Sequence, residues 1–103
     1  MHFLYHLVSE SDWMSFEGKD SYCPLSLESE GFIHLSTKPQ LLETAELFFK
    51  DKKGLLVLKI EIPDTDLKLK WEYSPERDEE FPHYYGALSR DRIQEISPFS
   101  SSL

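Results

Sequence analysis

The sequence has one cysteine, three arginines and no long apolar run, and each shortage excludes a class of protein. Cys23 cannot form an internal disulfide, which excludes a small secreted domain held together by disulfides. No apolar stretch approaches the roughly 20 residues that a membrane-spanning helix needs. The first residues also lack a basic segment followed by an apolar one, so no secretory signal is predicted. We therefore expect a cytoplasmic protein without a membrane partner.

Basic residues are outnumbered throughout the chain. Eleven Lys and Arg stand against nineteen Asp and Glu, which gives a formal net charge of −8. Nucleic-acid-binding domains usually carry a basic stripe, and a negative field repels phosphate backbones. The composition therefore disfavours nucleic acid as a partner.

The residues that are present fit one compact unit. A chain of 103 residues, 40% of them hydrophobic and 14% aromatic, is too short to build a second sizeable core. We expect a single domain over residues 1–98 and a frayed tail over residues 99–103.

Hydrophobic periodicity predicts an α+β fold with five to six strands and two helices. Helices are expected from Ser9 to about Gly18, and from Thr37 to about Lys50. The polar stretches 19–30 and 74–80 are predicted to be loops. Strands are expected over residues 2–8, 31–36, 55–62, 67–73, 84–88 and 92–96.

The stretch from Gly31 to Thr37 brings an apolar run, a histidine and two hydroxyls to the start of a helix. The period of two in a strand places Phe32, His34 and Ser36 on one face. Thr37, with a glutamine three residues later, matches a capping box for the following helix. This junction fits a ligand site, and it fits ordinary architecture equally well.

Three histidines, His6, His34 and His83, lie in strands or at strand entrances among aromatic residues. Their convergence on one cleft would create a polar site with an apolar wall, the usual form of a small-molecule pocket. The alternative is that each ring is half-buried and hydrogen-bonded inside the core. No metal site is predicted, because such a site needs three or four converging ligands and no Cys-x2-Cys pair is present.

Ser36 and the later glutamates are the remaining candidates. Ser36 shares a strand face with His34 but lacks the Gly-x-Ser-x-Gly elbow of many nucleophilic serines, so we interpret it as a contact residue. Glu72 shares a face with two lysines, and Glu80 ends an acidic stretch, so both also fit simple solvated positions.

Four segments together resemble a bacterial family, number 952 among the domains of unknown function. The resemblance covers nearly the whole chain, and its two histidine-bearing stretches are the most specific part. It implies a fold rather than a reaction. The segments are Tyr5-His6, the run from Gly31 to Thr37, Trp71-Glu72, and the run from Glu80 to Leu88.

That family is similar to the ADP-ribosyltransferase superfamily, whose small split antiparallel-rich sheet holds NAD in a cleft. Tyr5-His6 resembles the first half of its Tyr-His-Gly-Thr motif, but Leu7-Val8 departs from the second half. The run from Ile33 to Ser36 resembles Val-His-Leu-Ser in the RNA 2′-phosphotransferase branch. The arginines that hold phosphates in that branch have no clear match here, which argues against phosphate transfer from RNA.

The superfamily resemblance implies binding of a nucleotide such as NAD or ADP-ribose, with ADP-ribosyl transfer or NAD hydrolysis as the activity. NAD would be a substrate, and no tightly bound cofactor is expected. Glu72 or Glu80 would stabilise the cationic transition state. The alternative is a non-catalytic module that binds a ligand or a protein through the same cleft. The implied ligand contacts are His6, Phe32, His34, Ser36, Thr37, His83 and Tyr85.

Overall fold

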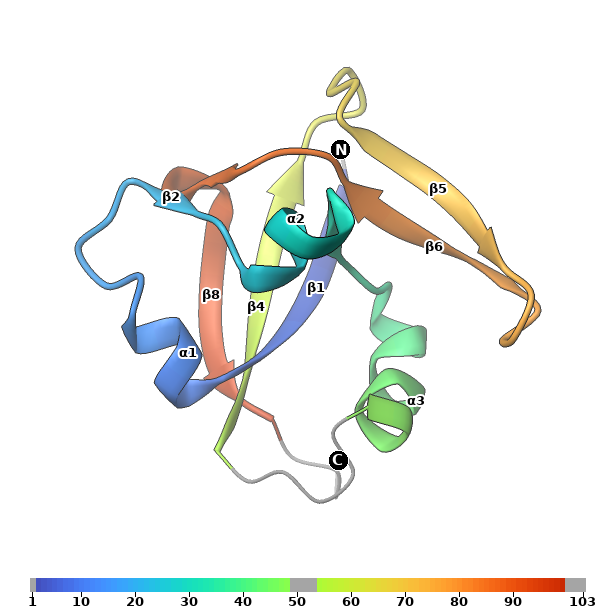
Figure 1. The fold of residues 1–103 in the computed structure, drawn as a ribbon, viewed down its shortest axis with the longest axis horizontal. Coiled ribbons are helices and arrows are strands. Elements are labelled where there is room, and N and C mark those ends of the chain that lie inside the picture. The colour runs from blue at the N-terminus through green and yellow to red at the C-terminus, as the bar shows by residue number, and fades with distance from the viewer. Residues whose placement is uncertain (1, 49–53, 100–103) are drawn as a thin grey trace.

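The computed structural model describes residues 2–48 and 54–99, which fold into three small antiparallel sheets and three α-helices (Figure 1). The α+β class is therefore confirmed, with more elements and more sheets than the sequence predicted. The helices are α1 (Glu10–Met14), α2 (Leu25–Glu30) and α3 (Lys38–Phe48), and a 3₁₀ turn spans Arg90–Arg92. The strands are β1 (His2–Ser9), β2 (Ser21–Tyr22), β3 (Ile33–His34), β4 (Leu55–Ile62), β5 (Leu69–Ser74), β6 (Glu79–Tyr84), β7 (Leu88–Ser89) and β8 (Ile93–Pro98).

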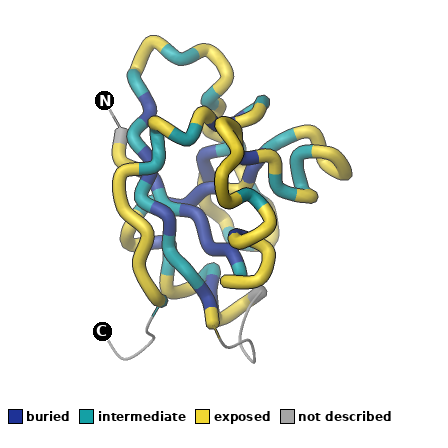
Figure 2. Tube along the Cα trace, turned by 90° about the vertical axis from the view of Figure 1, so that its left-hand side faces the viewer, coloured by how far each residue is buried: buried dark blue, intermediate teal, exposed yellow. Residues whose placement is uncertain are grey.

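The first sheet has the order β1-β4-β8 and supplies much of the core. β4 was predicted from its alternation, and Leu58, Ile60 and Ile62 on its inner face are at most 1% exposed. Burying these branched side chains on one face of a pleated strand is what favours the strand over a helix here. Figure 2 shows the buried residues running through the middle of the molecule, with exposed residues on the outer loops. Within the described residues, no helix is long and apolar enough to cross a bilayer.

The other sheets are β2-β7 and β3-β6-β5, and one isolated bridge joins the last of these to the first sheet. In the bridge, Tyr5 and Ser36 exchange two backbone hydrogen bonds of 2.8 Å each. Just before it, the Leu35 amide donates to the carbonyl of Pro82 in β6 at 3.0 Å. The chain thus crosses from one sheet to another at residues 35 and 36, so β3 ends at His34 and the predicted strand over 31–36 was too long.

The helix starts follow the capping residues in the sequence. Ser9 accepts the Asp12 amide at 3.2 Å at the start of α1, although this helix ends at Met14, before Gly18. At α3, the Gln40 side-chain oxygen accepts the Thr37 amide at 2.9 Å, which is one half of the predicted capping box. The predicted end of this helix near Lys50 lies outside the described residues.

The predicted loop over 19–30 was wrong in two places, because Ser21–Tyr22 forms the short strand β2 and Leu25–Glu30 forms α2. Pro24 precedes this helix, and Gly31 closes it with a left-handed φ of 88°. The Gly31 amide donates to the Leu27 carbonyl at 3.0 Å, and Leu27 packs against the core. A proline before the helix and a glycine after it are the expected end signals, but six residues rich in serine and glutamate gave little periodicity between them.

The predicted loop over 74–80 and the strand over 84–88 were also misplaced. β6 begins at Glu79 and ends at Tyr84, and a short turn through Asp78, with φ at 50°, connects it to β5. Pro82 argues against a central strand because it lacks an amide donor. Here its carbonyl still accepts from Leu35, so the strand tolerates it.

The strict alternation of apolar and polar residues over 67–73 predicts one buried face for β5, but two of the large side chains on that face are exposed. Trp71 and Tyr73 are 39% and 59% exposed. β5 pairs only with β6 and forms the edge of its sheet, at one side of the molecule in Figure 1. At the C-terminal end, β8 runs two residues beyond the predicted strand, and the Phe99 amide donates to the Leu55 carbonyl at 2.9 Å.

Candidate functional site

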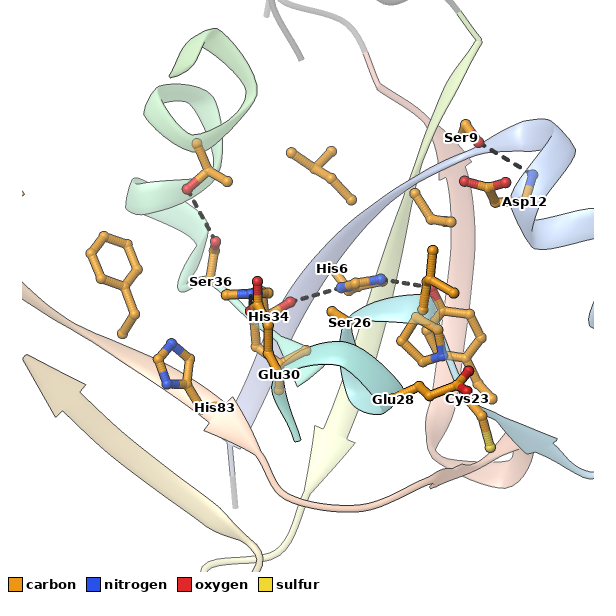
Figure 3. Close-up of a pocket in the computed structure, with 18 of the residues that line it drawn as sticks. His6, Ser9, Asp12, Cys23, Ser26, Glu28, Glu30, His34, Ser36 and His83 are labelled. Atoms are coloured by element: carbon orange, nitrogen blue, oxygen red, sulfur yellow. Dashed lines mark hydrogen bonds and ion pairs between the residues drawn. The ribbon is translucent and has the colours of Figure 1, made fainter. Parts of the chain in front are cut away.

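A cavity of about 910 Å³ opens between the first sheet, the three helices and the β5–β6 hairpin. His6 of β1, His34 of β3, Ser36 and His83 of β6 all line it, so four of the predicted contact residues face one cavity. Figure 3 shows His83 and Ser36 toward one end, Cys23 toward the other, and His6 between them. This volume lies near the upper end of the range for small-molecule sites, which is about 300 to 1,000 Å³.

His6 is buried and makes two hydrogen bonds inside the protein. Its Nδ1 lies 2.7 Å from the backbone carbonyl of His34, and its Nε2 lies 2.7 Å from the Tyr22 hydroxyl. A carbonyl only accepts, so Nδ1 carries the hydrogen and Nε2 accepts from Tyr22. Burial lowers the pKa of His6 to about 4 and raises the pKa of Tyr22. Both groups are therefore neutral at pH 7, and a ligand would have to displace one of these bonds to reach the ring nitrogens.

His34 is half-exposed and faces several rings. Its Nε2 pairs with the Glu30 carboxylate, one helical turn earlier at the end of α2. The ring meets Phe32 edge-on at a centroid distance of 4.7 Å and His83 edge-on at 5.4 Å. The unpredicted helix α2 therefore supplies the carboxylate that holds His34.

His83 belongs to a cluster with Glu72, Tyr85 and Phe32. One oxygen of the Glu72 carboxylate accepts from His83 Nδ1 at 2.8 Å and from the Tyr85 hydroxyl at 2.5 Å. The hydrogen bond from Tyr85 is the largest cause that lowers the pKa of Glu72, and the bond from His83 comes next. The bond between Tyr85 and Glu72 also raises the pKa of Tyr85. Phe32 stacks on the His83 ring at 4.1 Å, with 19° between the planes. This Glu72–His83 pair fixes the hydrogen on Nδ1 and leaves Nε2 as a base when the ring is neutral.

The remaining predicted residues lie behind or beside the cavity wall. Phe32, Glu72 and Tyr85 do not line the cavity. Phe32 and Glu72 contact His83, which does line it, and Tyr85 is bonded to Glu72. Thr37 lies at the start of α3. Glu80 is exposed, and its backbone carbonyl accepts from the Gln40 side chain at 2.8 Å. Of the two candidate carboxylates, Glu72 is therefore the one bonded to a histidine of the cavity.

Two lining residues carried no signal in the sequence. Tyr22 holds His6, and Arg77 is the only lysine or arginine lining the cavity within the described part of the chain. Arg77 lies in the acidic stretch that was predicted to be a loop, where a single cation fits a solvated position. Among the described residues there is no group of three or more His, Cys, Asp or Glu side chains that could hold a metal ion.

The fold and the site together define a small α+β protein with a large histidine-lined cavity. The chain belongs to the family described as "Protein of unknown function (DUF952)", whose model matches residues 7–96. No curated protein matches the chain.

Solved structures of a relative show the same fold. The crystal structure of protein CC0527 from Caulobacter crescentus is 27% identical over 96% of this chain and 87% of its own, with a TM-score of 0.84. The solution NMR structure of the same protein is 28% identical over 97% of this chain and 86% of its own, with a TM-score of 0.82. Both were structural genomics targets, so the likeness concerns the fold and carries no activity.

Proposed function

We propose that the cavity binds a nucleotide such as NAD or ADP-ribose, in a fold of the ADP-ribosyltransferase kind. One observation carries this proposal: His6, His34, Ser36 and His83, which the superfamily resemblance named as contacts, line a single cavity. Its volume of about 910 Å³ suits an extended ligand of several rings.

The geometry changes the roles that these residues would play. Phe32 is stacked on His83 and does not line the cavity, so a ligand ring would pack against His83 or Phe81 instead. The two nitrogens of His6 are already bonded, so hydroxyl contacts to a ribose fall to Ser36 and His34. His6 then acts by holding β3 against β1 through its bond to the His34 carbonyl.

An ADP-ribosyl transfer or NAD hydrolysis in this cavity would use His83 as its base. The bond from the ribose C1′ to nicotinamide breaks, and its electron pair leaves with nicotinamide. A water or acceptor hydroxyl then bonds to C1′ and gives its proton to Nε2 of His83. Glu72 does not touch the cavity, so it is a positioning residue that orients His83 through Nδ1.

The separation of Glu72 from the cavity also favours a second candidate, a non-catalytic module that binds its ligand through the same wall. In the superfamily chemistry a carboxylate stabilises the oxocarbenium-like transition state directly. Here Glu72, the carboxylate that is bonded to His83, does not itself line the cavity. NAD binding without any release of nicotinamide would support this second candidate over the enzyme.

The test is to add millimolar NAD or ADP-ribose to the purified protein and to measure both the melting temperature and free nicotinamide. A ligand at ten times its Kd stabilises by about 1.4 kcal/mol, or about 6 °C for a domain of this size. His34→Ala, at a half-exposed position, should reduce this shift. Lys70→Ala is the matched control, because Lys70 pairs with His83 across the hairpin but does not line the cavity. No shift with either nucleotide and no nicotinamide release would overturn the proposal.

A further inference from the structure

Arg77 is the feature of this cavity that the proposed chemistry does not use. It projects from the turn between β5 and β6, and its side chain is only 9% exposed. The guanidinium lies over the Phe81 ring, with its carbon 4.1 Å from the ring centroid. Its Nη1 donates to the Thr44 hydroxyl of α3 at 2.9 Å, and that hydroxyl lies 3.3 Å from Ser36 Oγ. A buried cation therefore sits beside two hydroxyls of the cavity wall.

Most of the hydrogen-bonding capacity of this guanidinium is unused. Nε and Nη2 are buried and have no hydrogen-bond partner. The Glu43 carboxylate lies 3.7 Å from Nη2, too far for a hydrogen bond, and its side chain is 57% exposed. A buried arginine is costly unless its charge is paired and its donors are satisfied. This arrangement is explained if an anion completes it.

We infer that Arg77, with the hydroxyls of Thr44 and Ser36, forms an oxyanion subsite that takes a phosphate group. The Nε and Nη2 edge of a guanidinium presents two parallel donors that match two oxygens of a phosphate. A tetrahedral phosphate also keeps further oxygens for the two hydroxyls, which a planar carboxylate bound by the same edge does not. Nε and Nη2 lie out of contact with solvent, so the proposal requires this edge of the side chain to turn toward the cavity when the anion binds.

The charges that line the cavity indicate where in it an anion would bind. Asp12, Glu28 and Glu30 line the cavity and would repel an anion, whereas Arg77 is the one lysine or arginine that lines it in the described part of the chain. The subsite deepens the proposed nucleotide binding and rests on it for the identity of the ligand, with the pyrophosphate of NAD at Arg77. Phosphate recognition itself requires only the three residues named.

The experiment compares inorganic pyrophosphate and NAD as probes for the wild type, Arg77→Met, Arg77→Lys and Thr44→Val, by calorimetry and by melting temperature. Arg77→Met should weaken pyrophosphate binding by at least about tenfold, because it removes charge-assisted hydrogen bonds. Arg77→Lys keeps the charge without the fork and should bind with intermediate affinity. Lys38→Met is the control, since Lys38 is exposed and outside the cavity lining.

The outcomes separate the two proposals. Equal pyrophosphate affinity in the wild type and Arg77→Met overturns the subsite. NAD binding that is unchanged in Arg77→Met overturns the placement of the NAD pyrophosphate at Arg77 and leaves the nucleotide proposal standing. Pyrophosphate binding that depends on Arg77, without any response to NAD or ADP-ribose, supports the subsite and overturns the nucleotide proposal. If Arg77→Met does not fold, Arg77→Lys and Thr44→Val decide: unchanged affinity in both overturns the subsite.

Discussion

The ring of His6 donates from Nδ1 to the backbone carbonyl of His34 across 2.7 Å, and so joins β1 to β3 through a side chain. The other ring nitrogen accepts from Tyr22, next to which the rings of Trp13 and Phe16 pack. This histidine is thus a structural element of the cavity wall as well as part of its surface. Replacing His6 should therefore lower the stability of the fold more than it lowers the affinity for a ligand.

We expect His6→Ala to lower the free energy of unfolding by about 2 to 4 kcal/mol, because it leaves a cavity and two unpaired buried partners. Urea denaturation at pH 7 measures the loss. Tyr22→Phe removes only the hydroxyl and should cost about 1 to 2 kcal/mol. A His6→Ala cost no larger than that of Tyr22→Phe would contradict this account.

The buried His6 also predicts a loss of stability in acid. Its pKa falls from 6.5 to about 4 in the folded protein, so between these values the unfolded chain takes up a proton and the folded chain does not. Stability is complete above pH 6.5 and falls by up to about 3 kcal/mol as the pH drops to 4. His6→Asn, which keeps a donor but does not titrate, is the control. The free energies of unfolding of the two proteins, plotted against pH, should converge toward pH 4. Parallel plots would refute the assignment.

Tyr85 is expected to control the ionisation of Glu72. Its hydroxyl is the largest cause that lowers the pKa of this carboxyl, so Tyr85→Phe should raise that pKa toward the ordinary value. Carboxyl carbon chemical shifts followed against pH measure it. Tyr73→Phe removes a hydroxyl that is bonded to Asp78 instead and should leave Glu72 unchanged. A Glu72 titration that is the same in both variants would show that the Tyr85 bond has no influence.

Gln40 predicts a stability cost that comes from two backbone partners. It is 5% exposed, accepts from the Thr37 amide and donates to the Glu80 carbonyl. Gln40→Ala should therefore cost about 2 kcal/mol in thermal or urea unfolding. Gln94→Ala is the matched control, because this amide is exposed and donates only to the Asp91 carbonyl at 3.2 Å. Equal costs for the two variants would contradict the role of Gln40 in joining α3 to β6.

Gly31 should resist replacement because of its backbone alone. Its φ is 88° and an added Cβ would meet nothing within 4 Å, so Gly31→Ala isolates the conformational cost of about 1 kcal/mol. Gly86→Ala is the opposite control, since its φ is not in the left-handed region and the three atoms nearest to its new Cβ belong to the flexible Lys68 side chain, the first at 3.1 Å. Denaturation of both proteins tests this, and a larger loss in Gly86→Ala would reverse the argument.

Local signals predicted local structure well. The alternation through Leu58 and Ile60 identified β4, and Ser9 and Gln40 marked the helix starts, because these patterns act within one element. The predicted burial of Trp71 was wrong, because alternation identifies two faces of a strand but not which face the rest of the chain will cover. The start of β6 was misplaced, and Pro82 is tolerated within that strand because its carbonyl alone makes the contact to Leu35.

The candidate site was predictable only in part, for the same reason. His34 and Ser36 stood out because they lie beside each other in one recognisable stretch. Arg77 did not, because its importance depends on a turn folding back onto α3 across 33 residues of sequence. No periodicity describes such a contact. A resemblance could point to the histidines, but not to a cation from an irregular segment.

The bridge between Tyr5 and Ser36 limits how the two sheets beside the cavity can move relative to each other. Two backbone hydrogen bonds at one point join β1 to the chain leaving β3. A contact of this kind resists separation but gives little resistance to tilting, so side-chain packing sets the angle between the two sheets. The amide protons of these two residues are therefore natural reporters. Their hydrogen exchange with solvent would report each separation of β1 from the chain after β3. A ligand that contacts both segments would slow this exchange.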